Sequence, residues 1–292
     1  MSAVPVLEVG GTHVTAALVD AGGWVVSQAT RVHLDSSADA EHILGTFVEA
    51  GAALRSTAGA RWGVAMPDPF DYARGTATFQ GVGKFDALHG MDVGAALMQR
   101  LPQRPSAIAF LNDADAFILG EWIRGAAAGH SRCVGITLGT GVGSGWLVDG
   151  RITDSEPGVP PLGRAHHLTV NGAALEETVS RRAIRRAYAA TTGDEQADVR
   201  EIAARARGGE VSAAAVLRHA FCSLGAALAP AARTFGADVI VFGGSMTASW
   251  DLLEPWWRDG LDWPDAPPVL LAADPEHAGL VGAARYALDG AG

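Results

Sequence analysis

The sequence predicts an α/β protein with two domains, each built on a sheet flanked by helices. Residues 9–20 (VGGTHVTAALVD) and 138–149 (LGTGVGSGWLVD) follow one plan, in which a Gly/Thr loop joins two apolar strands and the second strand ends at an aspartate. Each stretch opens a meander that continues into helices and further strands, so the topology restarts halfway along the chain. The 292 residues, of which 48% are hydrophobic, are enough to bury two cores.

The first half alternates strands and helices after its opening meander. Strands are indicated by apolar, β-branched runs between glycine-rich turns, and helices by apolar residues spaced three and four apart. The predicted elements are strands at 4–9, 13–19 and 24–28, a helix over 38–57, a strand at 61–65, a non-periodic loop over 68–85, a helix near 92–100 and a strand at 107–111.

The second half begins with a helix over 113–128 and repeats the meander. Alanine-rich segments in which Leu, Ile, Val and Phe recur are predicted as helices, separated by glycines. The predicted elements are strands at 133–138, 145–148 and near 152, helices at about 175–190, 197–207 and 211–235, a strand at 239–242, a helix from about 246, a strand at 269–271 and a helix at 279–288.

This order of elements sets the expected domain limits. We expect a small α/β domain over 1–111, joined by the C-terminal helix at 279–292, and a large α/β domain over 112–278. A ligand is expected in the cleft between the two domains, where loops of both halves converge.

Charge and composition exclude several classes of partner. Asp and Glu outnumber Lys and Arg by 32 to 22, and the net charge of −10 opposes binding to nucleic acid or to anionic membranes. We find no leader-like start and expect no stretch of the roughly 18 apolar residues that a membrane span needs. Cys133 and Cys222 are too few for a disulfide framework or a thiolate metal site. We therefore expect a cytoplasmic protein with reduced thiols.

The two glycine loops are candidate phosphate sites. Their backbone N–H groups are unobstructed, and the glycines at 10, 11, 139, 141 and 143 can adopt positive φ, which lets a phosphate approach closely. Two such loops facing one another would hold one polyphosphate chain. The alternative is that each loop is an ordinary hairpin turn.

Acidic residues beside these loops could carry phosphoryl-transfer chemistry. Glu8 ends the first strand and could meet a hydrated Mg²⁺, or it is an exposed acid at a strand end. Asn112 could orient an acceptor hydroxyl whose proton Asp113 takes, although Asp113 could equally be a helix N-cap. Glu176 opens a helix and could bind a sugar hydroxyl or complement the helix dipole. The arginines at 181, 182, 185 and 186 are interpreted as a solvated helix face.

Four segments carry a resemblance to a known family. They are Glu8-Val-Gly-Gly-Thr12, Asn112-Asp113-Ala114, Leu138-Gly-Thr-Gly-Val-Gly143 and Val239-Ile-Val-Phe-Gly-Gly244. They resemble segments of the ROK family of sugar kinases: residues 8–12 its first phosphate motif, 112–114 its catalytic motif, 138–143 its second phosphate motif and 239–244 its adenosine-packing segment. The likeness covers nearly the whole chain.

The resemblance implies the duplicated actin-like ATPase fold, ATP and Mg²⁺ as cofactors, a sugar hydroxyl as acceptor and a homodimer. It implies that Asp113 is the general base and that Glu8 meets Mg²⁺ through water. The residues that it assigns to the nucleotide and its phosphates are Gly10, Gly11, Thr12, Gly139, Thr140, Gly141, Gly243 and Gly244.

The acceptor side departs from the family pattern. Glu8 stands where aspartate is usual, which adds a methylene beside a metal of strict geometry. Arg164 replaces a sugar-binding glutamate. The Cys-rich zinc loop is absent, so no zinc site is expected and His167 is left for structure or substrate. Gly81 and Phe85 stand where asparagine and tryptophan are common.

These observations favour an ATP-dependent kinase of a sugar or a sugar-like polyol such as a cyclitol. Asn112, His167 and Glu176 would position the acceptor, while Arg164 would form a local salt bridge, contact an anionic substrate group or mark lost activity. A catalytically silent sensor of the same fold is the alternative, and a polyphosphate donor stays open because glycine loops recognise phosphates. A DNA-binding repressor is disfavoured because the first strand begins near Val4.

Overall fold

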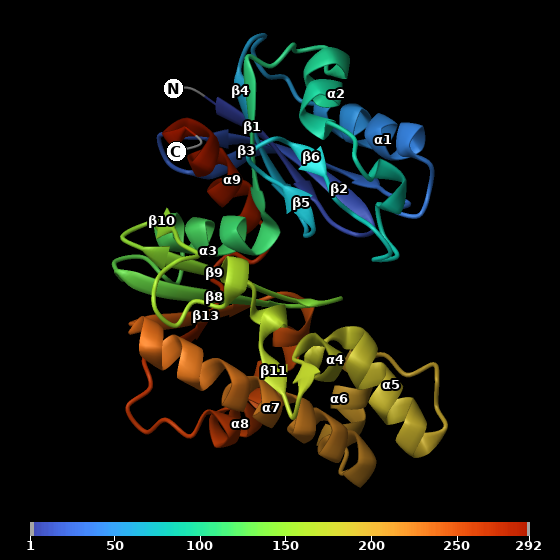
Figure 1. Cartoon of the computed structure of the whole chain (residues 1–292), viewed down its shortest axis with the longest axis vertical. Helices are drawn as coiled ribbons and strands as arrows, with labels where there is room; N and C mark the ends of the chain where they lie inside the picture. Colours follow the sequence, from blue (N-terminus) through green and yellow to red (C-terminus); the bar gives the residue numbers. More distant parts are fainter. Residues whose placement is uncertain (1–2, 291–292) are drawn as a thin grey trace. The chain divides into compact units, whose positions relative to one another are not determined.

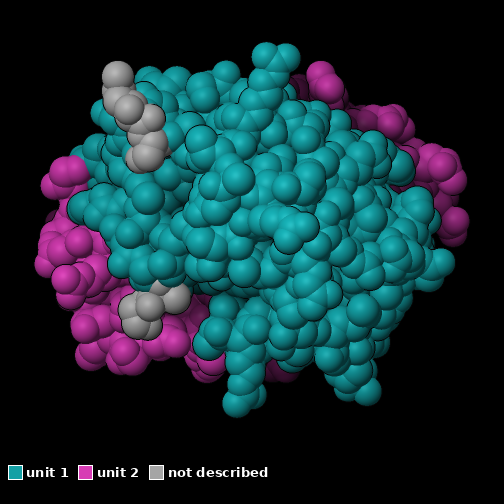
Figure 2. Space-filling model, turned by 90° about the horizontal axis from the view of Figure 1, so that it is seen from above, with its two compact units in different colours: residues 1–128, 274–292 teal, residues 129–273 magenta. Residues whose placement is uncertain are grey.

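The computed structural model describes residues 3–290, and the chain divides into two compact units, coloured separately in Figure 2. Unit 1 comprises Met1–Ala128 and Asp274–Gly292, and unit 2 comprises Gly129–Ala273. These limits differ from the boundaries at 111 and 278 that the sequence suggested. Helix α3 (Asp113–Arg124) and residues 274–278 lie in unit 1.

Close backbone packing explains why α3 lies in unit 1. The C-terminal helix α9 (Ala278–Asp289) packs along α3 and approaches its backbone closely at Gly120 and Gly282. A Cβ atom on Gly120 would lie 1.9 Å from the Ala278 carbonyl oxygen, and one on Gly282 would lie 1.9 Å from the Ala116 carbonyl oxygen. Such close contact maximises dispersion, so the two helices pack as one block.

The sheet of unit 1 has the strand order β3-β2-β1-β4-β7, and Figure 1 labels β1, β2, β3 and β4. Strands β1 to β3 are antiparallel, and β4 and β7 run parallel to β1. The elements are β1 (Ala3–Val9), β2 (His13–Asp20), β3 (Val25–His33), α1 (Ala40–Ala52), β4 (Arg61–Met66), α2 (Val93–Arg100) and β7 (Ala107–Asn112), followed by α3. The segment predicted as a loop contains a small hairpin of β5 (Phe70–Asp71) and β6 (Thr76–Ala77) and a 3₁₀ helix (Asp86–Leu88).

The register of β1, β2 and β3 places polar side chains in a row on one face of this sheet. Glu8 pairs with Thr15, and Thr15 pairs with Arg31, so the three side chains emerge on the same face. Their neighbours Leu7 and Val9 point to the other face, into the core that includes α1. The polar row therefore lies on the face that α9 covers.

The sheet of unit 2 repeats that of unit 1, with the order β10-β9-β8-β13-β14. Again a meander precedes two parallel strands. The strands are β8 (Arg132–Leu138), β9 (Val142–Val148), β10 (Arg151–Ile152), β13 (Val239–Gly243) and β14 (Val269–Leu271), with a small hairpin of β11 (Thr169–Val170) and β12 (Ala173–Ala174). The helices are α4 (Glu176–Val179), α5 (Arg181–Thr192), α6 (Val199–Arg207), α7 (Val211–Phe235) and α8 (Trp250–Leu261), with 3₁₀ helices at Pro161–Gly163, Ala165–His167 and Ser245–Ser249.

One predicted helix of unit 2 is two helices. The segment expected as a helix over 175–190 breaks at Ser180, whose backbone is extended with ψ 155°. The Ser180 hydroxyl accepts a hydrogen bond from the Ala183 amide at 3.2 Å and caps α5. The break turns the chain between Glu176 and the arginines of α5.

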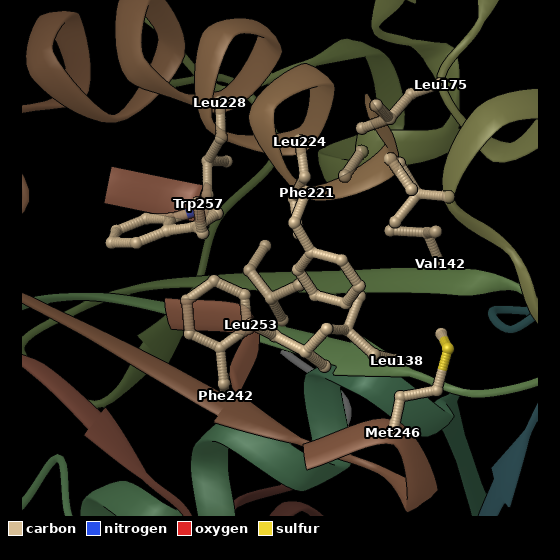
Figure 3. Close-up of a cluster of buried hydrophobic side chains, with 14 of the residues drawn as sticks. Leu138, Val142, Leu175, Phe221, Leu224, Leu228, Phe242, Met246, Leu253 and Trp257 are labelled. Atoms are coloured by element: carbon tan, nitrogen blue, oxygen red, sulfur yellow. The ribbon is translucent and has the colours of Figure 1, made fainter. Parts of the chain in front are cut away.

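Helix α7 lies at the centre of the unit 2 core. Figure 3 shows Phe221, Leu224 and Leu228 of this helix pointing toward Phe242 and Trp257 from β13 and α8. An 18-residue window of this helix has a mean hydropathy of 1.5 and is long and apolar enough to cross a membrane, so the expectation that no stretch reaches that length was wrong. Core residues require the same apolar composition, and here that composition serves the interior of unit 2.

Candidate functional site

A pocket of about 390 Å³ opens in unit 1 where β1 ends. The end of β1, the first glycine loop, strands β2 and β3, the first residue of α3 and the segment before α9 all contribute to it. Its lining residues are Glu8, Val9, Gly10, Thr12, His13, Thr15, Ala29, Thr30, Arg31, Asp113, Pro275, Glu276, His277 and Leu280. The pocket thus brings together Glu8, the first glycine loop and Asp113, three features that the sequence had singled out separately.

Glu8 is held at the floor of this pocket by its strand and by α9. Burial, reinforced by the nearby charge of Asp113, raises the pKa of Glu8 to about 7, although Arg31 and His277 act in the opposite direction. The carboxylate lies directly against the backbone of Gly279, where a Cβ atom would be only 2.2 Å from Oε1. Glu8 is therefore not a freely solvated acid at a strand end, and its carboxylate occupies the space beside Gly279.

Asp113 is the first residue of α3, and Asn112 is its N-cap. The Asn112 carboxamide oxygen accepts a hydrogen bond from the Ala114 amide at 2.9 Å, while its nitrogen donates to Asp68 Oδ2 at 3.0 Å and to the Tyr72 hydroxyl at 3.1 Å. The alternative in which Asp113 serves as the N-cap is therefore wrong. Asn112 caps the helix, and the Asp113 carboxylate lines the pocket.

The partners of Asn112 bear on its expected role. The residue is 3% exposed, and both ends of its carboxamide already make hydrogen bonds within unit 1. Because Asn112 links β7 to Asp68 and Tyr72 as it caps α3, its contribution to Asp113 is to fix the first turn of the helix. An acceptor contact of Asn112 stays a prediction.

The first glycine loop is tight. The Gly10 amide donates to the His13 carbonyl oxygen at 2.8 Å, and the Thr12 hydroxyl lies 2.9 Å from His13 Nδ1. A Cβ atom on Gly11 would meet no atom within 4 Å, so the loop surface is open there. A small ligand can therefore reach the backbone of this turn.

The second glycine loop meets three other segments inside unit 2. The Gly139 amide donates to the Gly141 carbonyl oxygen at 3.1 Å, and the Gly139 carbonyl oxygen accepts from the Arg181 amide at 3.1 Å. A Cβ atom on Gly141 would lie 3.1 Å from Glu176 Oε2. Gly244 lies against β8, where its Cβ would be 2.3 Å from the Leu138 carbonyl oxygen. The structure thus places Glu176 beside the loop that contains Thr140, and Gly244 beside Leu138, where that loop begins.

The conformational role expected for the glycines was wrong in part. None of the glycines at 10, 11, 139, 141 and 143 has positive φ; the described loops turn without entering the left-handed region. Their missing side chains supply open space instead, at Gly11 and Gly139 most clearly. Positive φ occurs at Gly244, with φ 90°, where the close approach to Leu138 requires glycine.

The acceptor-side candidates of unit 2 differ in exposure. Arg164 is 7% exposed and its guanidinium donates to the Ser144 carbonyl oxygen at 3.5 Å. His167 is exposed, with its ring 4.4 Å from that of His166. Glu176 is half-buried beside the second glycine loop. Among these three, Glu176 and His167 are accessible to a ligand.

The sequence analysis missed Arg31 and His277, which both line the unit 1 pocket. Arg31 joins Glu8 through the strand register, and His277 precedes α9 and lies 2.9 Å from Asp274 Oδ2 through Nδ1. Arg31 and His277 both act to lower the pKa of Glu8, against the effect of its burial. The regular alternation of polar residues along β3 could have suggested that Arg31 faces the same side of the sheet as Glu8. No local pattern could have placed His277 in the pocket, because its position depends on how α9 packs against the sheet.

The donor set of the pocket fits magnesium. Mg²⁺ is usually held by one or two carboxylates together with water and substrate phosphates, and Glu8 and Asp113 supply two carboxylates beside a glycine loop. Within residues 3–290, no three His, Cys, Asp or Glu side chains gather into a group that could hold an ion alone. Glu8 and Asp113 therefore suit an ion that arrives with a phosphate ligand.

Known proteins share this fold and, in part, this sequence. A model of the ROK family matches residues 5–289. A glucokinase of Thermotoga maritima is 27% identical over 271 residues, which span 85% of this chain and 83% of that protein. The solved ROK hexokinase of Thermus thermophilus has a TM-score of 0.77 and 27% identity, covering 97% of this chain and 96% of that chain. A Streptomyces griseus ROK glucokinase, solved with glucose and AMPPNP, has a TM-score of 0.79 and 25% identity, covering 99% and 100%. These findings confirm the predicted duplicated actin-like ATPase fold.

Proposed function

Because the chain belongs to the ROK family, we propose that it transfers a phosphoryl group from ATP to a hydroxyl of a sugar or sugar-like polyol, with Asp113 as general base. The observation that carries this proposal is the pocket in unit 1, where Asp113, Glu8 and the first glycine loop lie together. Asn112 caps α3, and Asp113, whose Oδ1 accepts a hydrogen bond from the Ala114 amide at 2.9 Å, lines that pocket. The glucokinase relatives and the glucose and AMPPNP complex of a similar structure support the same chemistry.

The residues of the pocket suit the separate tasks of phosphoryl transfer. Asp113 accepts the proton of the acceptor hydroxyl as its oxygen attacks phosphorus. Backbone N–H groups of Gly11 and Thr12 bind donor phosphate oxygens, and those of Thr140 and Gly141 provide the same contacts in unit 2. The N–H groups of Gly10 and Gly139 donate to the carbonyl oxygens of His13 and Gly141 and hold the two turns in shape. When Mg²⁺ is bound, it neutralises the negative charge of the phosphates. Glu8 and the donor phosphates would hold this ion, with Glu8 acting through water.

The acceptor contacts are assigned by chemistry and access. Glu176 and His167 are accessible and offer a carboxylate and an imidazole to sugar hydroxyls. Gly243 and Gly244 lie at the end of β13, where a flat backbone can pack against adenosine. Arg164 is buried against β9, and we assign it to the support of the segment before His167.

The test is ADP release with Mg²⁺ and ATP in the presence of glucose, other hexoses and cyclitols. We expect turnover with at least one acceptor and loss of about 10² to 10⁴ in kcat for Asp113→Asn, the range typical of a general base. Asp115→Asn is the matched control, since that carboxylate is buried in α3 and does not line the pocket. Absence of turnover with every acceptor, or equal activity of Asp113→Asn and wild type, would overturn the proposal.

A further inference from the structure

Arg31 lies in the unit 1 pocket without a bonded partner in the protein. It lines the pocket together with Glu8, Asp113 and the first glycine loop. Within residues 3–290, its guanidinium makes no hydrogen bond, ion pair or contact with an aromatic ring. The residue is also exposed, so the N–H donors of the guanidinium are available to a ligand.

The charges around the pocket single out this arginine. The lining residues include three carboxylates, those of Glu8, Asp113 and Glu276, whereas Arg31 is the one arginine among them and no lysine is present. The other basic lining residues are His13 and His277, whose imidazoles are charged only when protonated. Arg31 is therefore the permanent positive charge of this pocket.

The strand register explains why Arg31 forms no ion pair with Glu8. Glu8, Thr15 and Arg31 occupy paired positions on β1, β2 and β3. Adjacent strands lie about 4.8 Å apart, so the backbones of Glu8 and Arg31 are separated by roughly 10 Å, with the short side chain of Thr15 between them. All three residues line the pocket, and the carboxylate and the guanidinium thus flank the space above Thr15.

The charge of Arg31 acts across this space. Burial raises the pKa of Glu8 most strongly, followed by the charge of Asp113, whereas Arg31 acts to lower that pKa. A guanidinium that influences a carboxylate through the pocket exerts the same field on any anion placed there. An anionic group bound between Arg31 and the glycine loop is therefore stabilised.

Phosphoryl transfer requires positive charge at this place. A triphosphate at the first glycine loop brings its negative charge close to Glu8 and Asp113, which repel it. During transfer, negative charge spreads over the oxygens of the moving phosphoryl group, and an arginine that contacts these oxygens lowers the barrier. The planar guanidinium can bind two phosphate oxygens through paired hydrogen bonds. Backbone N–H groups carry no full charge, so Arg31 supplies what the loop lacks.

We propose that Arg31 is a catalytic residue that binds the terminal phosphoryl group of ATP and stabilises it during transfer. This inference rests on the proposed kinase function. In the reaction, the acceptor oxygen forms a bond to the terminal phosphorus, and the acceptor proton passes to Asp113. The P–O bond to ADP breaks with its electron pair on the departing oxygen. Arg31 donates hydrogen bonds to oxygens of the phosphoryl group that do not react.

Nucleotide binding without an acceptor tests this contact directly. ADP and AMPPNP differ by the terminal phosphoryl group, and calorimetric titration at fixed Mg²⁺ gives the affinity of each for wild type and Arg31→Gln. We expect AMPPNP to lose about tenfold or more in affinity, as loss of a charge-assisted hydrogen bond predicts, while ADP affinity stays unchanged. With ATP and a working acceptor, kcat of Arg31→Gln should fall about 100-fold or more.

A second background separates a phosphate contact from an effect exerted through Glu8. In Glu8→Gln, which removes the neighbouring carboxylate charge, the additional substitution Arg31→Gln should lower AMPPNP affinity by the same factor as in wild type. A loss of affinity that disappears in this background would make Arg31 a positioning residue for Glu8 and would overturn the inference.

The matched control is Arg61→Gln. Arg61 is exposed at the start of β4, before Ala65, the residue that pairs with Glu8, and it does not line the pocket. Like Arg31, it makes no ion pair within residues 3–290. Its substitution should leave both affinities and kcat unchanged.

The outcomes distinguish this inference from the proposed function. Equal losses of ADP and AMPPNP affinity in Arg31→Gln, or a kcat equal to that of wild type, overturn the inference and leave the proposed kinase intact. Absence of turnover by wild type with every acceptor overturns the kinase proposal, and the inference with it.

Discussion

Substituting Gly279 by alanine tests how strongly the proposed phosphoryl transfer depends on the position of the Glu8 carboxylate. A Cβ atom at this position would lie 2.2 Å from Glu8 Oε1, which is 1.2 Å short of the 3.4 Å at which ordinary contact begins. The carboxylate is the far end of a flexible side chain, so it can yield at small cost to folding. It must nevertheless leave its position beside Asp113 and the glycine loop. Since a misplacement of about 1 Å in an active site can cost about 100-fold in rate, we expect kcat/KM of Gly279→Ala to fall by about that factor.

Steady-state kinetics with a titration of Mg²⁺ measures this effect. The loss should be accompanied by a higher Mg²⁺ requirement, because Glu8 is the residue assigned to the ion. Thermal unfolding of the same variant should stay close to wild type. Gly45→Ala is the matched control: Gly45 lies within α1, and a Cβ there would meet no atom within 4 Å.

A second substitution makes the reasoning refutable. Glu8→Asp withdraws the carboxylate by about one carbon–carbon bond, roughly 1.5 Å, which exceeds the overlap created by the alanine. The double variant Glu8→Asp/Gly279→Ala should therefore be more active than Gly279→Ala alone. Wild-type kinetics for Gly279→Ala, or strictly additive losses in the double variant, would show that Gly279 does not position Glu8.

Three further results are expected. Asn112→Ala should lower the free energy of unfolding by about 1–3 kcal/mol, because it removes the cap of α3 and the hydrogen bonds of the carboxamide to Asp68 and Tyr72. Urea titrations measure this loss, and an unchanged urea midpoint would contradict the capping role. The pKa of Glu8 in the folded chain, about 7, exceeds its ordinary 4.5, so between these values the folded chain keeps a proton that the unfolded chain has lost. Without Mg²⁺, the free energy of unfolding should therefore fall as pH rises from 4.5 to 7. Urea titrations across this range should show that slope for wild type and not for Glu8→Gln. Asp113→Asn should keep the melting temperature of wild type while losing turnover, since Asn112 caps the helix; a large drop in melting temperature would assign Asp113 to folding.

Much of the fold could be predicted from local sequence patterns. Strand β14 and helix α7 begin and end at the predicted residues, and both meanders appear where the glycine loops repeat. Strand β3 was predicted too short, at 24–28, because its residues up to His33 alternate half-buried and exposed positions and are not an apolar run. The break at Ser180 had a local signal, a serine before a helix, that the alanine-rich background outweighed.

The site was predictable only as far as neighbouring residues define it. Glu8, the glycine loops and Asp113 lie next to strand ends and could be found from the sequence. Arg31 reaches the pocket through the register of three strands, and His277 through the docking of α9, so neither has a signal within a short window. The same holds for the arginines of α5, because the turn at Ser180 is what places the start of this helix beside the second glycine loop.

The return of α9 to unit 1 has a consequence for biosynthesis. Helix α3 presents Ala116 and Gly120 to a partner that is not made until residues 278–289 have left the ribosome. Unit 2 is continuous in sequence and can complete its core earlier. Until α9 is made, the surface of α3 that it covers stays exposed to solvent. A released chain that ends at Ala273 should therefore have a second half that resists protease and a first half that is cleaved.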